Sequence, residues 1–183
     1  MVDPSLGGKY MTFKLADEEY GFEILNVREI IGMMDITRVP KTPDYIRGVI
    51  NLRGKVHPVV DLRLKFGMPE TIPTEQTVII VVQCQAATGS CTMGILVDEV
   101  LEVLNVEAKD IEPPPKLGGM ETESHDFILG VGKVDHRVIF LLDIGKVLNQ
   151  SEFNEVATAA LNSDAWMVDH HKNRSICPAT IYG

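Results

Sequence analysis

The stretch Asp44-Tyr45-Ile46-Arg47-Gly48-Val49 recurs later in the chain as Asp126-Phe127-Ile128-Leu129-Gly130-Val131. The two copies lie 82 residues apart, and the same spacing holds without a gap as far as Asp61 and Asp143. Both copies join turn residues to aliphatic runs, as expected of short strands with tight connections. The pattern predicts that the chain contains two copies of one small unit.

A second block of the repeat lies upstream and uses a different spacing. A shift of 73 residues aligns residues 21–29 with 94–102, so that glycine, valine and glutamate coincide. The two shifts differ by nine residues, which predicts an insertion in the second copy. The proline-rich segment 112–119 is the expected place, because consecutive prolines cannot continue a strand ladder.

Short apolar runs indicate β-strands. Met11, Phe13 and Leu15 alternate with polar residues, and the acidic stretch 17–19 separates them from a second alternating run, as in a hairpin. Five further apolar runs lie mostly between glycine or proline residues: 49–52, 56–62, 78–82, 93–97 and 138–142. Many short strands with glycine-containing turns predict a mostly all-β fold of barrels or a sandwich.

Helical signals are few. Short helices are expected at 25–31, 62–66, 100–106 and 144–148, and a C-terminal helix in the alanine-rich segment 154–166.

Composition bounds the function. The 183 residues are 45% hydrophobic and 23% charged, which is typical of a globular protein. The net charge of −9 argues against nucleic acid and against an anionic membrane surface, since both attract cationic proteins. Three cysteines, an odd number, favour a reducing compartment. Residues 1–9 carry no apolar signal segment and no aliphatic run could span a bilayer, so we expect a cytoplasmic protein without direct membrane insertion.

Glycine-containing loops do not match a phosphate-binding motif. Lys133 follows Gly130-Val131-Gly132, but the hydroxyl residue after the lysine and the first glycine of the motif are missing. The segment 7–9 departs from the motif in the same way, so β-turns are the expected structure and no cofactor is predicted.

Cysteine and histidine residues give weak signals for catalysis or metal binding. His170 and His171 near Cys177 form one short cluster rather than four zinc ligands at a recognisable spacing. Cys84 ends an aliphatic run and Cys91 lies in a Gly-Ser turn, without a histidine or acidic partner close in sequence, although partners in space stay open. We therefore expect no catalytic residue and no metal.

One hairpin stands out. Aliphatic runs flank Asn51-Leu52-Arg53-Gly54, so Arg53 is expected at a tight bend where Gly54 permits a positive φ. The arginine could pair with a neighbouring acid or a carbonyl, which the pattern favours slightly. It could instead anchor an interface, because arginine is enriched among residues that dominate binding energy.

Charge is unevenly distributed. Residues 28–65 contain eight Lys/Arg and four Asp/Glu, whereas residues 98–126 contain two Lys/Arg and nine Asp/Glu. Opposite signs on two homologous halves would suit head-to-tail association with a similarly built partner.

From Phe13 onward the sequence resembles the CheW family of bacterial chemotaxis coupling proteins. The resemblance rests on motifs in the same order along the chain, ending near residues 144–148: 13–15, 19–25, 27–30, 42–49, 51–54, 61–63, 94–98, 113–114 and 129–132. It implies two packed five-stranded SH3-like barrels, in agreement with the repeat, and no enzymatic activity.

The resemblance also implies partners and a place of action. Family members couple the cytoplasmic tips of chemoreceptors to the regulatory domain of the histidine kinase CheA, which is itself CheW-like, so a head-to-tail ring of such modules is expected. The resemblance implies recruitment to receptor arrays at the inner face of the membrane. Val27, Glu29 and Arg53 match family positions associated with partner binding, while Gly48 and Gly54 are interpreted as structural turns.

The expected organisation is a CheW-like domain over 1–150, with a first barrel at roughly 10–70 and a second at roughly 76–150. Residues 151–183 then form a C-terminal helix or tail of unknown role. Two alternatives stay open: a CheW-like regulatory or adaptor module of a related pathway, such as surface motility, and a small-barrel enzyme that uses Cys91 or the pair His170 and His171.

Overall fold

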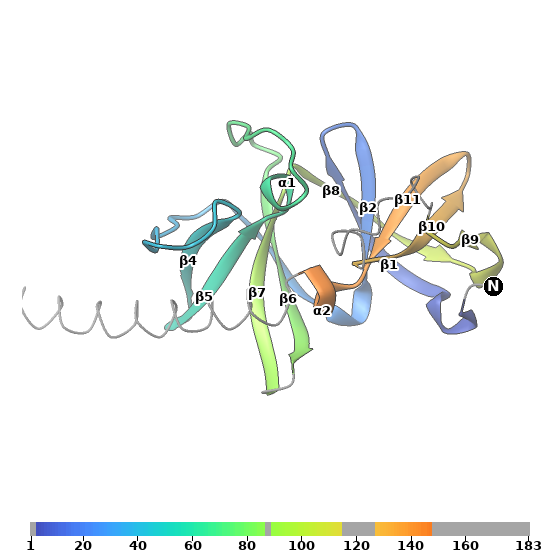
Figure 1. Ribbon diagram of the computed structural model, residues 1–183, viewed down its shortest axis with the longest axis horizontal. Coiled ribbons are helices and arrows are strands. Elements are labelled where there is room, and N and C mark those ends of the chain that lie inside the picture. The colour runs from blue at the N-terminus through green and yellow to red at the C-terminus, as the bar shows by residue number, and fades with distance from the viewer. Residues whose placement is uncertain (1–2, 87–88, 115–126, 148–183) are drawn as a thin grey trace, which may run out of the picture.

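The computed structural model describes residues 3–86, 89–114 and 127–147, and shows two β-sheets packed side by side (Figure 1). The five-stranded sheet has the order β3-β6-β7-β5-β4, and the six-stranded sheet has the order β8-β1-β2-β11-β10-β9. The predicted fold class is confirmed, except that the second sheet has a sixth strand of two residues. The strands are β1 (Gly8–Leu15), β2 (Glu18–Glu23), β3 (Val27–Gly32), β4 (Ile46–Leu52), β5 (Lys55–Asp61), β6 (Val78–Ala86), β7 (Gly89–Val97), β8 (Glu99–Val106), β9 (Ile111–Glu112), β10 (Ile128–Val134) and β11 (Arg137–Leu142).

Helices are short. The described helices are η1 (Pro4–Leu6), η2 (Ile24–Asn26), α1 (Leu62–Lys65), η3 (Ala108–Asp110) and α2 (Ile144–Val147). In Figure 1, α1 and α2 lie at opposite ends of the seam between the sheets. The helices predicted near residues 62 and 144 are therefore confirmed, whereas the one predicted at 154–166 lies outside the described residues.

Two predicted helices are wrong. Residues 27–32 and 99–106 form strands β3 and β8, and only the 3-10 turn η2 precedes β3. Periodicity cannot separate a short apolar strand from a short helix, and the branched residues in these segments favour strands. Each of these strands pairs with one neighbour, β3 with β6 and β8 with β1, at the end of its sheet.

The repeat seen in the sequence is a structural repeat. A shift of 82 residues carries the bounds of β4 onto β10 and of α1 onto α2, and a shift of 73 carries β3 into β8. Equivalent strands also pair equivalently: β5 runs parallel to β7 with Val59 opposite Gly94, and β11 runs parallel to β2 with Leu141 opposite Gly21.

Each sheet combines strands from the two halves of the chain. Strands β1 and β2 from the first half join β8 to β11 of the second half, while β6 and β7 join β3 to β5. Each sheet therefore contains a hairpin from the other half of the chain. The parallel pairs β5–β7 and β11–β2 hold these exchanged hairpins in place.

The described residues form three apolar clusters, because several strands are buried on both faces. Val59, Ile79 and Leu96 belong to a cluster within the five-stranded sheet, and a separate cluster around Tyr10 and Ile139 lies within the six-stranded sheet. The largest cluster draws on both sheets and holds them together; its fully buried members include Phe13, Phe22, Val60, Ile80, Ile95 and Leu142. Because successive residues of a strand point to opposite faces, continuous aliphatic runs such as 78–82 supply two cores at once.

The five-stranded sheet closes through the segment after β3. Thr37 and Val49 exchange two backbone hydrogen bonds of 2.9 Å each, so the chain that leaves β3 pairs with β4 at the opposite end of the sheet. Closure removes exposed strand edges and fixes the position of the β4–β5 hairpin relative to β3.

Candidate functional site

The β4–β5 hairpin ends in a two-residue turn. Leu52 and Lys55 are the last paired residues, and Arg53 and Gly54 between them have φ values of 52° and 83°. Positive φ at both central residues is the type I′ turn that matches the twist of a hairpin. The Asn51 side chain accepts a hydrogen bond of 3.0 Å from the Gly54 N–H, which favours this turn.

Arg53 and Glu29 form a two-pronged ion pair. The two terminal nitrogens of Arg53 donate to Glu29 Oε1 at 3.0 Å and to Oε2 at 2.9 Å. The pair connects the hairpin tip to strand β3, 24 residues earlier. The Arg53 side chain is 80% exposed and that of Glu29 is 29% exposed. An exposed pair of this kind contributes about 0–1 kcal/mol to stability, so its main effect is to orient the guanidinium at the surface.

Val27 lies on the same strand as Glu29. It pairs with Val82 of β6 and packs partly against the main cluster between the sheets. The ladder shifts register between Val27 and Glu29, and the intervening Arg28 is exposed and donates 2.7 Å to the side chain of Gln83. Val27 and Glu29 therefore share the half-buried side of β3, while Arg28 points to solvent.

The two glycines expected at turns have different roles. Gly54 lies in the turn, and open space surrounds the position of a hypothetical Cβ. Gly48 lies inside β4 with a φ of 141°, and a Cβ there would stand 2.1 Å from the carbonyl oxygen of Thr37. Gly48 is thus required by the close approach of the segment that closes the sheet, rather than by a turn.

The second sheet has a related ion pair beside the corresponding hairpin, although its arginine, Arg137, is the repeat equivalent of Lys55 and not of Arg53. The β10–β11 hairpin turns at Asp135 and His136, which also have positive φ values of 48° and 66°. Beside this turn, Arg137 donates to Glu102 of β8 at 2.6 Å and to Glu19 at 2.8 Å, and these hydrogen bonds raise the pKa of Arg137. Glu102 is the repeat equivalent of Glu29, so each sheet ties a hairpin arginine to a glutamate on its terminal strand.

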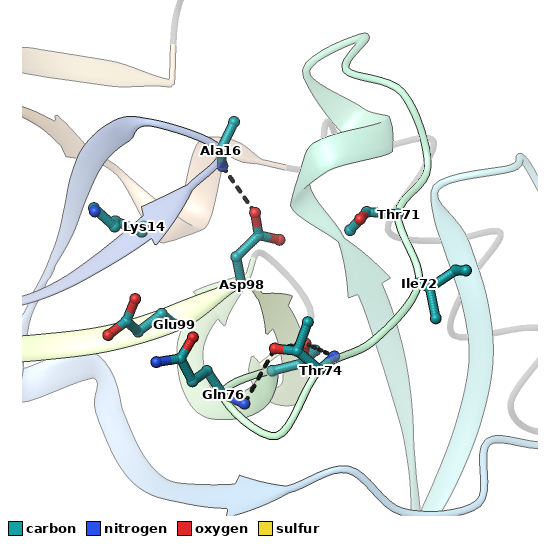
Figure 2. Close-up of a pocket in the computed structure, with 9 residues that line it drawn as sticks. Lys14, Ala16, Thr71, Ile72, Thr74, Gln76, Asp98 and Glu99 are labelled. Carbon is teal, nitrogen blue, oxygen red and sulfur yellow. Dashed lines mark hydrogen bonds between the residues drawn. The ribbon is translucent and has the colours of Figure 1, made fainter.

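A small cleft opens at the seam between the sheets (Figure 2). Its volume is about 210 Å³, and its walls come from β1, the β7–β8 junction and the loop after α1. Asp98 points across it and accepts a hydrogen bond of 2.8 Å from the Ala16 N–H, and Ile72 on the far wall is 85% exposed. The charged residues of its walls are Lys14, Asp98 and Glu99.

Among the residues considered for catalysis or metal binding, only Cys84 and Cys91 come together in the described part of the chain. Cys91 donates to the Thr92 carbonyl at 3.7 Å, and Cys84 donates to the Cys91 carbonyl at 3.7 Å. Among the described residues no group of three or more His, Cys, Asp or Glu side chains could hold a metal ion. His170 and His171 lie outside the described residues. No helix in the described ranges is long and apolar enough to cross a membrane.

Comparisons with known proteins agree with this geometry. A family model of the CheW-like domain matches residues 9–152.

The chain belongs to the CheW-like domain family.

The CheW-like chain has curated relatives of similar length. The chemotaxis protein CheW of Klebsiella aerogenes is 38% identical over 160 residues, which cover 87% of this chain and 93% of that protein. Protein FrzA of Myxococcus xanthus is 32% identical over 151 residues, which cover 81% and 90%. A solved structure, the scaffolding protein TtCheW from Thermoanaerobacter tengcongensis, matches with a TM-score of 0.69 at 34% identity and covers 80% of this chain and 95% of that one. The family resemblance predicted from the sequence is confirmed.

Sequence reasoning missed a charged network beneath the cleft of this CheW-like domain. Asp61 is 4% exposed; it accepts from Arg47 Nε at 3.1 Å and caps α1 by accepting from the Leu64 N–H at 3.3 Å. Arg63 pairs with Asp98, which ties α1 to the β7–β8 junction. The aspartate in front of a short apolar run was the available signal, because aspartate is a preferred helix N-cap.

Proposed function

We propose that this CheW-like protein is a non-enzymatic adaptor that couples chemoreceptors to the regulatory domain of a CheA-type histidine kinase. The observation that carries the proposal is the oriented, exposed guanidinium of Arg53, held by Glu29 on a hairpin that the closed sheet positions. An oriented arginine at the surface is a frequent anchor of protein interfaces, because its planar group donates several hydrogen bonds in a fixed geometry. The family membership of the chain supports the adaptor role.

The docking surface consists of Val27, Glu29 and Arg53. Glu29 fixes Arg53, and Val27 adds half-buried apolar area on the same strand. Ile30, the next residue of β3, is 40% exposed on the solvent-facing side of the strand, so β3 also offers apolar contact there. An apolar centre with a bidentate arginine at its border fits the usual anatomy of a protein interface.

The experiment compares two substitutions on the same hairpin. Arg53→Ala is expected to weaken binding of the kinase regulatory domain by about 1–4 kcal/mol, the range for truncation of an anchor residue, while the melting temperature stays near wild type. Lys55→Ala is the matched control, because Lys55 is an exposed cation two residues away on the same hairpin and forms no ion pair with Glu29. Titration calorimetry with the kinase domain and with a soluble receptor tip gives both affinities. Wild-type affinity of a folded Arg53→Ala chain for both partners would refute the docking role.

A head-to-tail arrangement is proposed for the same reason. The second sheet offers a related ion pair, Glu102 with Arg137, beside an exposed Val103 that is the repeat equivalent of Ile30. Two similar surfaces, one on each sheet of the molecule, allow each sheet to bind a different barrel-containing neighbour. Such an adaptor would act in the cytoplasm, recruited to receptor arrays.

A second candidate is the same adaptor role in a pathway other than chemotaxis, such as surface motility. The similarity to a relative named Protein FrzA supports this second candidate, since that name does not specify chemotaxis. A deletion strain tested separately for swimming and for surface movement distinguishes the two pathways. The chemotaxis role requires that the deletion strain no longer swims toward an attractant. It also requires that the Arg53→Ala protein fails to restore this swimming.

A further inference from the structure

The β6–β7 hairpin places two cysteines directly opposite each other. The ladder runs without a register shift from Val78 and Val97 to Ala86 and Gly89, and within it Cys84 pairs with Cys91. Directly opposed residues in antiparallel strands have Cα atoms about 4.5–5.5 Å apart, whichever kind of pair they form. That spacing lies within the range of about 4.4–6.8 Å at which disulfides occur. The two side chains also leave the same face of the hairpin, because directly paired residues do.

Both sulfurs are reduced and one is accessible. Cys84 is 6% exposed and belongs to the main apolar cluster, whereas Cys91 is half-buried and lies at the border of that cluster. In the described part of the chain, the thiols hydrogen-bond to each other and to the backbone carbonyls of Cys91 and Thr92. Neither sulfur is therefore held by a side-chain base that would mark it as an enzyme nucleophile, and a small oxidant can reach the pair from the Cys91 side.

The two thiols differ in acidity. A hydrogen bond from the Cys91 thiol lowers the pKa of Cys84, and the same hydrogen bond, together with burial, raises the pKa of Cys91. The hydrogen bond thus links the two sulfurs across the hairpin, as an intrachain disulfide requires.

We propose that Cys84 and Cys91 form a reversible intrachain disulfide, with a peroxide as the oxidant. A thiolate of the pair attacks one oxygen of hydrogen peroxide, which breaks the O–O bond and leaves a sulfenic acid and hydroxide. The other sulfur then attacks the sulfur of the sulfenic acid, displaces the hydroxyl as water and loses its proton. In total two thiols lose two electrons and two protons, and one peroxide becomes two waters. A dithiol reverses the reaction through a mixed disulfide.

The pair lies next to strand residues that support the docking surface. Val82, two residues before Cys84, pairs with Val27, and Gln83 accepts the hydrogen bond from Arg28. A covalent bond at this point would stiffen the end of the β6–β7 hairpin, whose strand β6 pairs with β3. The disulfide itself does not depend on the proposed adaptor role, because it is measured on the isolated chain.

The test counts thiols in the purified full-length chain. The reduced chain has three cysteines and is expected to take up three alkyl groups after denaturation. After treatment with hydrogen peroxide and removal of the oxidant, it is expected to take up one, to lose the mass of two hydrogen atoms, and to recover three after incubation with dithiothreitol. Peptide mapping is expected to join the segments that contain Cys84 and Cys91.

Variants separate this disulfide from other products. Cys177→Ser is expected to behave like the wild type with one alkyl group fewer in each state, whereas Cys91→Ser is expected to show no loss of two hydrogens. Circular dichroism establishes that both variants are folded. The proposal is overturned if folded Cys177→Ser keeps both thiols or gains only oxygen atoms, or if peptide mapping links Cys177 or a second molecule instead.

Discussion

Replacing Gly48 by alanine should destabilise the fold more than replacing Gly54. At Gly48 a methyl group would stand 2.1 Å from the Thr37 carbonyl oxygen, so the segment that closes the sheet must move away. This movement breaks the two backbone hydrogen bonds between Thr37 and Val49. At Gly54 a methyl group meets nothing within 4 Å, and only the positive φ is unfavourable.

The expected magnitudes follow from these contacts. Two backbone hydrogen bonds contribute about 1–3 kcal/mol together, and an alanine at the φ of Gly48 adds about 1–3 kcal/mol of backbone strain. We therefore expect Gly48→Ala to lower the free energy of unfolding by about 2–6 kcal/mol, the sum of these two ranges. For Gly54→Ala we expect about 1–2 kcal/mol, the cost of a left-handed conformation for a residue with a Cβ.

Urea denaturation followed by circular dichroism measures both variants against the wild type. The m-value has to be compared as well, because opening of the sheet in the native state would change the surface exposed on unfolding. Equal losses in the two glycine variants would show that the approach of Thr37 to β4 does not constrain the position of Gly48, and would refute this account of sheet closure.

Three other predictions concern charge. Asp61→Ala should lower the free energy of unfolding by about 2–3 kcal/mol, because it removes the cap of α1 and leaves the partly buried Arg47 paired with Glu70 alone. Urea denaturation measures this loss. A loss smaller than that of a control substitution at an exposed position would contradict the role of the buried network. Burial, and then the charge of Lys55, lower the pKa of His57 below 6.5, so the folded chain binds this proton less readily than the unfolded chain. Stability should therefore fall as the pH drops below about 6.5, and His57→Gln should reduce the difference between urea midpoints at about pH 7.5 and 5.5; an unchanged difference would contradict this. If opposite charges steer the partners, association rates should fall with added salt, and stopped-flow rates independent of salt would exclude steering.

The repeat could be predicted closely from the sequence, and most of the strand and helix positions follow from the repeat. Gapless spacing between the two copies put β4 on β10 and α1 on α2 within the same bounds. Short segments were less predictable: residues 100–106 were expected to form a helix, yet they lie in strand β8, which is stabilised by its pairing with β1, about 90 residues away in the chain. Local pattern carries no information about such a partner.

The candidate site was predictable in its parts but not in its arrangement. Arg53 could be placed in a turn because Gly54 and Asn51 are local signals for one. Its pairing with Glu29 depends on how the sheet closes through Thr37, which is a tertiary contact. The exchange of hairpins between the two halves was likewise invisible, because a repeat in sequence does not specify which copy a strand pairs with.

The exchanged hairpins also constrain the order of events during synthesis. The β1–β2 hairpin is the first part of the sheet to be made, yet its neighbours β8 and β11 are among the last. Until residues 99–142 have left the ribosome, Phe13 and Phe22 lack the C-terminal part of the cluster that buries them. The nascent chain thus leaves Phe13 and Phe22 incompletely covered until β8 and β11 are made, whereas all strands of the five-stranded sheet, within residues 27–97, are available before that point.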